Sequence, residues 1–153
     1  MAEHKHCRDA AALFDVSHMG QIRLVGAEAA AALETLVPVD IVDLAPGRQR
    51  YALFTNIVGG LQDDLMVTRT DAAAREAGFG DLFVVVNAGC KVYDLRHLNT
   101  HIGHRCGVVA MPDRALLALQ GPQAASALAR LNAGVAQLVF MTGGVFDLAG
   151  SRC

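Results

Sequence analysis

Apolar and polar residues alternate along several short stretches of the chain, and this period of two is typical of β-strands with one buried face. At residues 18–25, for example, Ile22 and Leu24 alternate with Gln21 and Arg23. Further strands are predicted at 50–55, 61–70, 82–86, around 108–109, 115–119 and 145–148. Gly59-Gly60 separates two of these stretches and indicates a tight hairpin.

Other stretches place apolar residues three and four positions apart, which favours helices with one buried stripe. Helices are predicted at 8–13, from 29 to the stop at Pro38, at 90–103, and from Gly121-Pro122 onward with proline at the first helical position. The third of these has the stripe Val92, Leu95, Leu98 and Ile102. Residues 71–80 are polar and rich in alanine and glycine, so we expect a loop with at most one helical turn.

Short strands joined by a hairpin, alongside helices of about ten residues, predict an α+β fold with mostly antiparallel sheet. Neither GxGxxG nor GxxxxGK[ST] occurs, so no motif supports a nucleotide-binding α/β fold.

Composition agrees with a globular domain and narrows the class of partner. The chain has 153 residues, of which 53% are hydrophobic and 18% charged, with a net charge of −2. It contains no basic run and no apolar stretch of the roughly 18 residues that span a membrane, so neither nucleic acid nor a membrane is an expected partner. The four cysteines are widely spaced without a CxxC pair, which favours free thiols in the cytoplasm.

Asp63 and Asp64 are the most informative polar residues, because adjacent strand residues point to opposite faces. Asp63 shares a face with Leu65 and Val67, which we expect to be the core side. Asp64 then lies on the polar side, beside the Gly59-Gly60 turn that leaves room for a ligand. Acidic residues are depleted in strands, so Asp64 is either a solvated carboxylate that protects an edge strand or a functional group.

Asn87 and the histidines admit two interpretations each. Asn87 follows a buried strand and precedes a helix, so its side chain either caps that helix or presents an amide to the edge of a heterocycle. His97 and His101 have the i, i+4 spacing of two metal ligands, but no third ligand lies at a suitable distance. We therefore expect a solvated helix face and no metal site.

Several blocks, taken together and in order, resemble the T-protein (aminomethyltransferase) family of the glycine cleavage system. The matching stretches are LFDVSHMG at 13–20, ALFTN at 52–56, GG at 59–60, DDLMV at 63–67, VVNAGC at 85–90, LALQGP at 117–122 and FMT at 140–142. The resemblance extends from about Glu3 to Cys153. Family members carry further sequence on both sides, and their pterin-holding glutamate and arginine lie in the later part. Residues 1–153 are thus expected to be a partial folate-binding catalytic region.

The resemblance implies a reaction and a site. The family transfers a methylene unit from the aminomethylated dihydrolipoyl arm of H-protein to tetrahydrofolate, with release of ammonia. The second aspartate of the Asp-Asp pair stands beside the folate, which makes Asp64 the candidate catalytic residue. Met19, Tyr51, Val85 and Asn87 match positions near the folate, although Tyr51 differs in type from some members.

Two alternatives share this scaffold. One is the folate domain of a sarcosine- or dimethylglycine-oxidising enzyme, and the other is a non-catalytic folate-binding regulator. The regulators carry a Lys-Gly-Cys-Tyr type signature that is absent here. By resemblance the expected compartment is the cytoplasm in a bacterium, or the mitochondrial matrix in a eukaryote.

Overall fold

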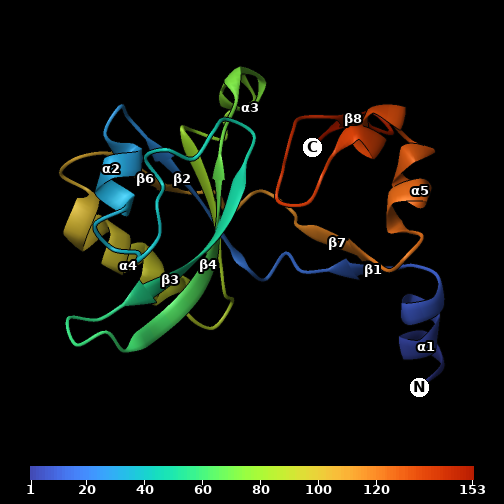
Figure 1. Cartoon of the computed structure of the whole chain (residues 1–153), viewed down its shortest axis with the longest axis horizontal. Coiled ribbons are helices and arrows are strands. Elements are labelled where there is room, and N and C mark those ends of the chain that lie inside the picture. Colours follow the sequence, from blue (N-terminus) through green and yellow to red (C-terminus); the bar gives the residue numbers. More distant parts are fainter. The chain divides into compact units, whose positions relative to one another are not determined.

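A computed structural model describes residues 1–153, and the chain divides into two compact units. The larger unit comprises His18–Arg114 and Met141–Gly144, and the smaller comprises Met1–Ser17, Ala115–Phe140 and Val145–Cys153 (Figure 1). No helix of either unit is both long and apolar enough to cross a membrane.

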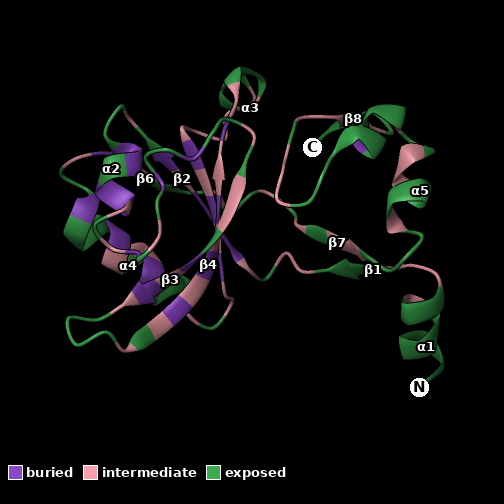
Figure 2. Cartoon of the chain, viewed as in Figure 1, coloured by how far each residue is buried: buried purple, intermediate pink, exposed green.

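The larger unit is built on a five-stranded sheet in which every neighbouring pair is antiparallel. Its strand order is β3-β4-β5-β2-β6, with β2 at Gly20–Val25, β3 at Gln49–Thr55, β4 at Leu61–Arg69, β5 at Leu82–Val86 and β6 at Gly107–Ala110. Residues buried and partly exposed alternate along β4 and β5, as Figure 2 shows. The sheet therefore has one core face and one outer face.

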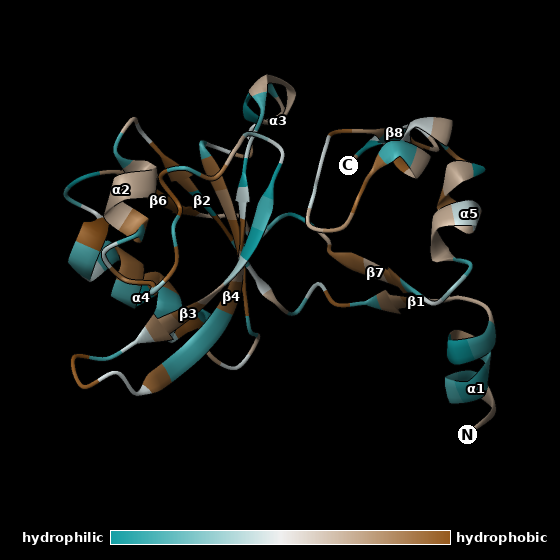
Figure 3. Cartoon of the chain, viewed as in Figure 1, coloured by the Kyte–Doolittle hydropathy of each residue, from teal (hydrophilic) through white to brown (hydrophobic).

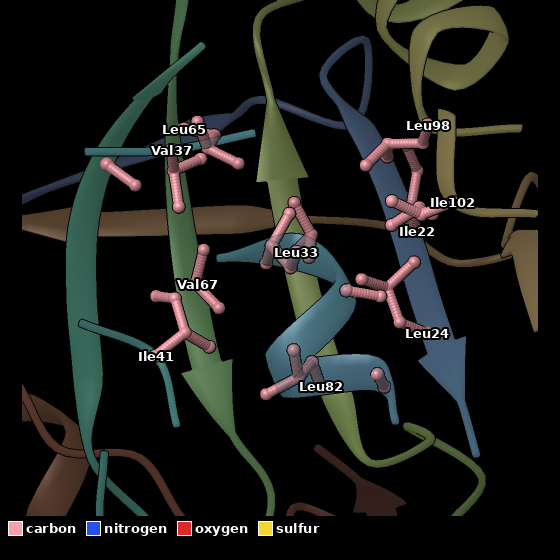
Figure 4. Packing of buried hydrophobic residues seen from close by; sticks show 14 of the residues in the cluster. Ile22, Leu24, Leu33, Val37, Ile41, Leu65, Val67, Leu82, Leu98 and Ile102 are labelled. Atoms are coloured by element: carbon pink, nitrogen blue, oxygen red, sulfur yellow. The ribbon is translucent and has the colours of Figure 1, made fainter. Parts of the chain in front are cut away.

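Two helices, α2 (Ala29–Leu33) and α4 (Lys91–Ile102), supply the other half of the core. Leu33, Leu98 and Ile102 have no solvent exposure and pack against strand residues such as Ile22 and Val67 (Figure 4). Burial of a side chain of this size stabilises the fold by about 1.5–3 kcal/mol. This packing holds α4 against β4 and β5. The polar residues Asp63, Asn87 and Asp94 lie near the beginning of this helix and on the adjoining strands.

The stripe predicted for α4 is partly wrong. Leu98 and Ile102 are buried as expected, but Val92 is 69% exposed and Asp94 is fully buried. The buried positions 94, 98 and 102 are four residues apart and lie on one helix face. A charged residue thus occupies a position that periodicity assigns to the core.

Between β4 and β5, the loop expected at residues 71–80 contains a short helix, α3 (Ala72–Glu76), in agreement with the predicted helical turn. Asp71 caps it, because its side chain accepts a hydrogen bond of 2.8 Å from the backbone N–H of Ala74.

The smaller unit contains α1 (Ala2–Asp9), the ribbon of β1 (Ala12–Asp15) with β7 (Leu117–Gln120), α5 (Ala124–Ala129), a 3₁₀ helix η1 (Ala133–Gln137), and the hairpin of β8 (Asp147–Leu148) with β9 (Ser151–Arg152). The helix predicted at 8–13 is largely wrong: α1 ends at Asp9, and residues 12–15 form a strand that pairs with β7. A partner about a hundred positions away decides that structure, which local pattern does not reveal.

The start of α5 also differs from the prediction. Gly121 has φ +119°, a left-handed conformation that a helix cannot contain, so Pro122 lies in the turn and the helix starts at Ala124. The α+β class with antiparallel sheets is confirmed by the strand pairings.

Candidate functional site

The side chains of Asp63 and Asp64 point to opposite faces of β4, as predicted. Asp63 is 8% exposed and lies on the core side, whereas Asp64 is half-buried on the outer face. The turn before them starts at Asn56, whose side-chain oxygen accepts from the N–H groups of Val58 and Gly60 at 3.0 and 2.8 Å. The hydrophilic stretch of β4 beside this hairpin is visible in Figure 3.

Strand register brings the expected site residues into two neighbouring rows on the outer face. Leu53 pairs with Asp64, and Tyr51 pairs with Met66, which in turn pairs with Val85. Gly20 pairs with Val86, so Met19, one residue before β2, stands across from Asn87. Four adjacent strands span about 14 Å, which is wide enough for a flat bicyclic ligand and its substituent.

Asn87 connects the two aspartates. Its Nδ2 lies 2.9 Å from Oδ1 of Asp63, 2.9 Å from Oδ1 of Asp64 and 3.2 Å from the backbone oxygen of Asp64. Only an amino group can occupy a position surrounded by three acceptors, so the amide orientation is set by its neighbours. The alternative that the Asn87 side chain caps α4 is wrong. This helix begins at Lys91 with Cys90 as its N-cap residue, and no side chain caps it.

A second carboxyl group lies behind Asp63. Asp94 is fully buried, and Oδ2 of Asp63 and both oxygens of Asp94 have no hydrogen-bond partner in the structure. Burial, followed by the neighbouring Asp63 carboxyl group, raises the pKa of Asp94 to about 7. Burial opposes ionisation of Asp63 as well, but its polar neighbours, of which Asn87 is the first, outweigh burial and lower the pKa of Asp63.

Two further ionisable groups, Cys90 and Tyr51, lie near these aspartates. Burial, then the charges of Asp63 and Asp94, raises the pKa of the Cys90 thiol, which also hydrogen-bonds Asp63. On the outer face, a hydrogen bond to Asp64 is the main cause that raises the pKa of Tyr51, whose side chain is 52% exposed. Cys90 therefore stays a thiol, and Tyr51 stays a neutral hydroxyl.

Close packing at Gly20 holds β2 against the start of α4. A Cβ atom at this position would lie 2.6 Å from Cγ2 of Val86 and 2.7 Å from Cβ of Lys91. Lys91 in turn donates from Nζ to the backbone oxygen of His18 at 2.9 Å. The segment that carries Met19 is thus tied to the helix that carries Asp94.

The histidines of α4 make ring contacts. His97 stacks on Tyr93 with ring centroids 6.1 Å apart, meets the edge of Phe54 at 5.2 Å, and lies 4.6 Å from the ring of His101. Burial and the neighbouring His101 lower the pKa of His97. In the structure no group of three or more His, Cys, Asp or Glu side chains is placed to hold a metal ion.

The sequence singled out Asp64 and Asn87 as candidates, and the structure places Asp94 and Cys90 near Asp63, which the sequence analysis did not anticipate. The spacing of four between Asp94, Leu98 and Ile102 could have revealed that Asp94 shares the buried face. Chemically, the site presents one half-buried carboxylate, a hydroxyl beside it and an excess of negative charge. Such a site can stabilise a developing positive charge and accept a proton or an N–H hydrogen bond.

Comparison of the sequence with known proteins shows the family to which the chain belongs. The family model described as the GCVT N-terminal domain matches residues 1–153. The mitochondrial aminomethyltransferase of Homo sapiens is 41% identical over 157 aligned residues, which cover 96% of this chain and 36% of that protein. The one from Dictyostelium discoideum is 36% identical over 164 residues, covering 100% of this chain and 38% of that protein.

A solved structure shows the same fold. The crystal structure of glycine cleavage system aminomethyltransferase T from Bartonella henselae matches with a TM-score of 0.81 and 40% identity, over 93% of this chain and 37% of that one. The chain therefore spans a little over one third of the length of the human, Dictyostelium and Bartonella proteins.

Proposed function

Since the chain belongs to the GCVT N-terminal domain family, we propose that residues 1–153 form part of the folate-binding catalytic region of a glycine cleavage aminomethyltransferase. The observation that carries the proposal is the placement of Asp64: a half-buried carboxylate, fixed by Asn87, on the sheet face that also displays Tyr51 and Val85. The human and Dictyostelium relatives are named as aminomethyltransferases, which favours this function over a sarcosine- or dimethylglycine-oxidising enzyme or a regulator.

The proposed reaction moves one carbon between two carriers. Two bonds of the aminomethyl carbon break, one to the lipoyl sulfur of H-protein and one to its nitrogen, and two bonds form to N5 and N10 of tetrahydrofolate. The two protons released by these folate nitrogens balance the thiol and the ammonia that leave. The products are the dihydrolipoyl arm, ammonia and 5,10-methylenetetrahydrofolate.

Asp64 suits this chemistry because the carbon becomes iminium-like, hence positively charged, as its bonds break. A carboxylate fixed in advance stabilises that charge without reorganisation. The same carboxylate can orient the attacking N–H of the folate or accept its proton. Asp63, the preceding residue, adds a second negative charge beside that of Asp64, while the Lys91 ammonium group donates to the backbone oxygen of His18.

Tetrahydrofolate is proposed to lie across the two rows of the outer face. Val85 and Met19 offer apolar contact to a flat ring, since thioether and β-branched side chains pack well on such surfaces. Tyr51 and Asn87 offer polar contact, and the carbonyl oxygen of Asn87 is available to an N–H of the ligand because its amino group already binds the aspartates. The relatives from eukaryotes are named mitochondrial, and we propose the matrix or the bacterial cytoplasm as the compartment.

A transfer assay tests the proposal. Aminomethylated H-protein and tetrahydrofolate are supplied, and ammonia and 5,10-methylenetetrahydrofolate are measured. Asp64→Asn keeps the shape of the side chain and removes its charge, so we expect kcat to fall at least tenfold, about 1.4 kcal/mol in the activation barrier. The matched control is Glu76→Gln on the exposed helix α3. Equal turnover by Asp64→Asn and the control would refute the role of Asp64.

A further inference from the structure

Arg114 holds a positive charge in a fixed place without a protein anion beside it. Its guanidinium carbon lies 4.1 Å from the centre of the Phe79 ring. The residue is half-buried, and its side chain is in no ion pair or hydrogen bond with the protein. A guanidinium over an aromatic face is attracted by the ring, which limits where the cation can lie. The charge of Arg114 is therefore positioned but not neutralised.

Strand register places this cation on the outer face of the sheet. Phe79 contacts Phe83 with ring centres 5.1 Å apart, and Phe83 is a partly exposed residue between two buried residues of β5. The backbone oxygen of Arg114 accepts a hydrogen bond of 2.9 Å from Nε2 of Gln21. Gln21 pairs with Val85 of the outer face. The backbone of Arg114 therefore lies against this face, beside the row of Val85.

The separation of this cation from Asp64 matches the length of the proposed substrate. Gln21, Val85 and Met66 form one row, and Asp64 lies one row further along β4. From the spacing of strands and residues, the backbones at Gln21 and Asp64 are about 12 Å apart. In tetrahydrofolate a benzoyl ring and an amide separate N10 from the glutamyl carboxylates, roughly 10 Å by standard bond lengths. A folate nitrogen beside Asp64 thus leaves these carboxylates within reach of Arg114.

The outer face has charges of opposite sign at its two ends. Asp64 is at one end, whereas Arg23 pairs with Phe83 and lies at the other end with Arg114. Asp113 precedes Arg114, but it is exposed and forms no ion pair with it. Tetrahydrofolate has the same polarity during transfer, because the one-carbon unit becomes positive near N5 and N10 while the tail carries two carboxylates. Charge complementarity therefore favours one orientation of the ligand.

We propose that Arg114 binds the carboxylates of the glutamyl tail of tetrahydrofolate and thereby orients the ligand, with its reacting nitrogens at Asp64. The inference rests on the proposed function, since it names the contact that the tail of that substrate makes. A planar guanidinium can donate two parallel N–H bonds to one carboxylate, and its edge stays free when its face lies on an aromatic ring. Arg114 is thus a specificity-determining residue that favours folates with a charged tail over tetrahydropterins without one.

Calorimetric titration of the 153-residue chain with two ligands tests this contact. Tetrahydrofolate carries both carboxylates, and its dimethyl ester keeps the tail but loses both charges. At low salt, wild type should bind tetrahydrofolate at least about fivefold more tightly than the ester, because charge-assisted hydrogen bonds are stronger than neutral ones. In Arg114→Gln this preference should fall below about twofold, while the affinity for the ester stays the same. The wild-type preference should also decrease as salt screens the charges.

Arg96→Gln is the matched control, because it removes one exposed guanidinium from α4, which packs on the core face of the sheet. Its preference for tetrahydrofolate should equal that of the wild type. Arg114→Lys keeps the charge and loses the planar fork, so it should retain part of the preference. Equal preferences in wild type and Arg114→Gln would overturn the proposal. An equal loss in Arg96→Gln would also overturn it, because net charge alone would then explain the effect.

The two hypotheses fail differently. A wild-type protein that binds neither ligand would refute the proposed function, and this inference with it. A wild-type protein that binds both ligands, with a preference that Arg114→Gln leaves unchanged, would refute the role of Arg114 alone.

Discussion

Nδ2 of Asn87 lies 2.9 Å from Oδ1 of Asp64, although 23 positions separate the two residues in the chain. The contact joins the end of β5 to the outer face of β4 and limits the rotation of the one carboxylate that we assign to catalysis. It also explains why a half-buried carboxylate is stable on a strand, since a hydrogen bond to a charged group stabilises by about 1.5–3 kcal/mol.

Asn87→Asp replaces the shared donor with a third carboxylate. Repulsion among the three acids should displace Asp64, so we expect affinity for tetrahydrofolate at pH 7.5 to fall at least tenfold, about 1.4 kcal/mol. Partial recovery is expected at pH 5.5, where one of the acids regains a proton. Calorimetric titration at the two pH values measures both effects.

The control for this variant is Asn99→Asp, which makes the same chemical change on the exposed face of α4. Tight binding by Asn87→Asp, equal to that of the control, would show that the bridge between the aspartates has no part in folate binding.

The raised pKa of Asp94 makes stability depend on pH. Between the ordinary value of 3.8 and the folded value of about 7, the folded state holds a proton that the unfolded state has released. Stability should therefore fall as the pH rises from 5 to 7, by up to about 1.4 kcal/mol per pH unit, and this contribution should be constant above 7. Urea unfolding at pH 5, 6, 7 and 8 measures the slope.

Asp94→Asn serves as the reference for that slope, because His97 contributes a pH dependence of stability with the opposite sign. The lowered pKa of His97 means that stability from this group is lost as the pH falls below 6.5. The difference between wild type and Asp94→Asn cancels His97 and isolates Asp94. A difference that does not change between pH 5 and 7 would show that Asp94 is ionised throughout.

Gly20 is predicted to be necessary for the close approach of β2 to α4. In Gly20→Ala the new methyl group would meet Val86 and Lys91 at 2.6 and 2.7 Å, so the free energy of unfolding should fall by about 1–3 kcal/mol. Gly89→Ala is the matched control, since a Cβ there meets nothing within 4 Å, and its stability should change by less than about 0.5 kcal/mol. Equal stabilities of the two variants would contradict this packing.

Local pattern predicted much of the larger unit, because buried and partly exposed residues alternate along strands such as β4 and β5 and mark each strand without knowledge of its partner. Alternation around Leu65 and Val67 placed Asp63 inside and Asp64 outside, and both placements hold. The bridge made by Asn87 was not predictable in this way, since it depends on how β4 and β5 pair. Asp94 was missed because a charged residue on a helix is assigned to solvent unless a buried partner is known.

The smaller unit was predicted less well, for a related reason. Residues 12–15 lie in a strand only because β7, about a hundred positions later, pairs with them. The conformation of Gly121 likewise decides where α5 begins. In both places the structure depends on information that a window of neighbouring residues does not contain.

The central claim is that the outer face around Asp64 binds tetrahydrofolate, and calorimetric titration of the 153-residue chain tests it most directly. Wild type and Asp64→Ala are titrated in parallel at pH 7, with Glu76→Gln as the control for loss of a negative charge elsewhere. We predict saturable binding by the wild type and the control, and a Kd at least tenfold higher for Asp64→Ala. Binding with the same Kd in Asp64→Ala, or no saturable binding by the wild type, would contradict the account.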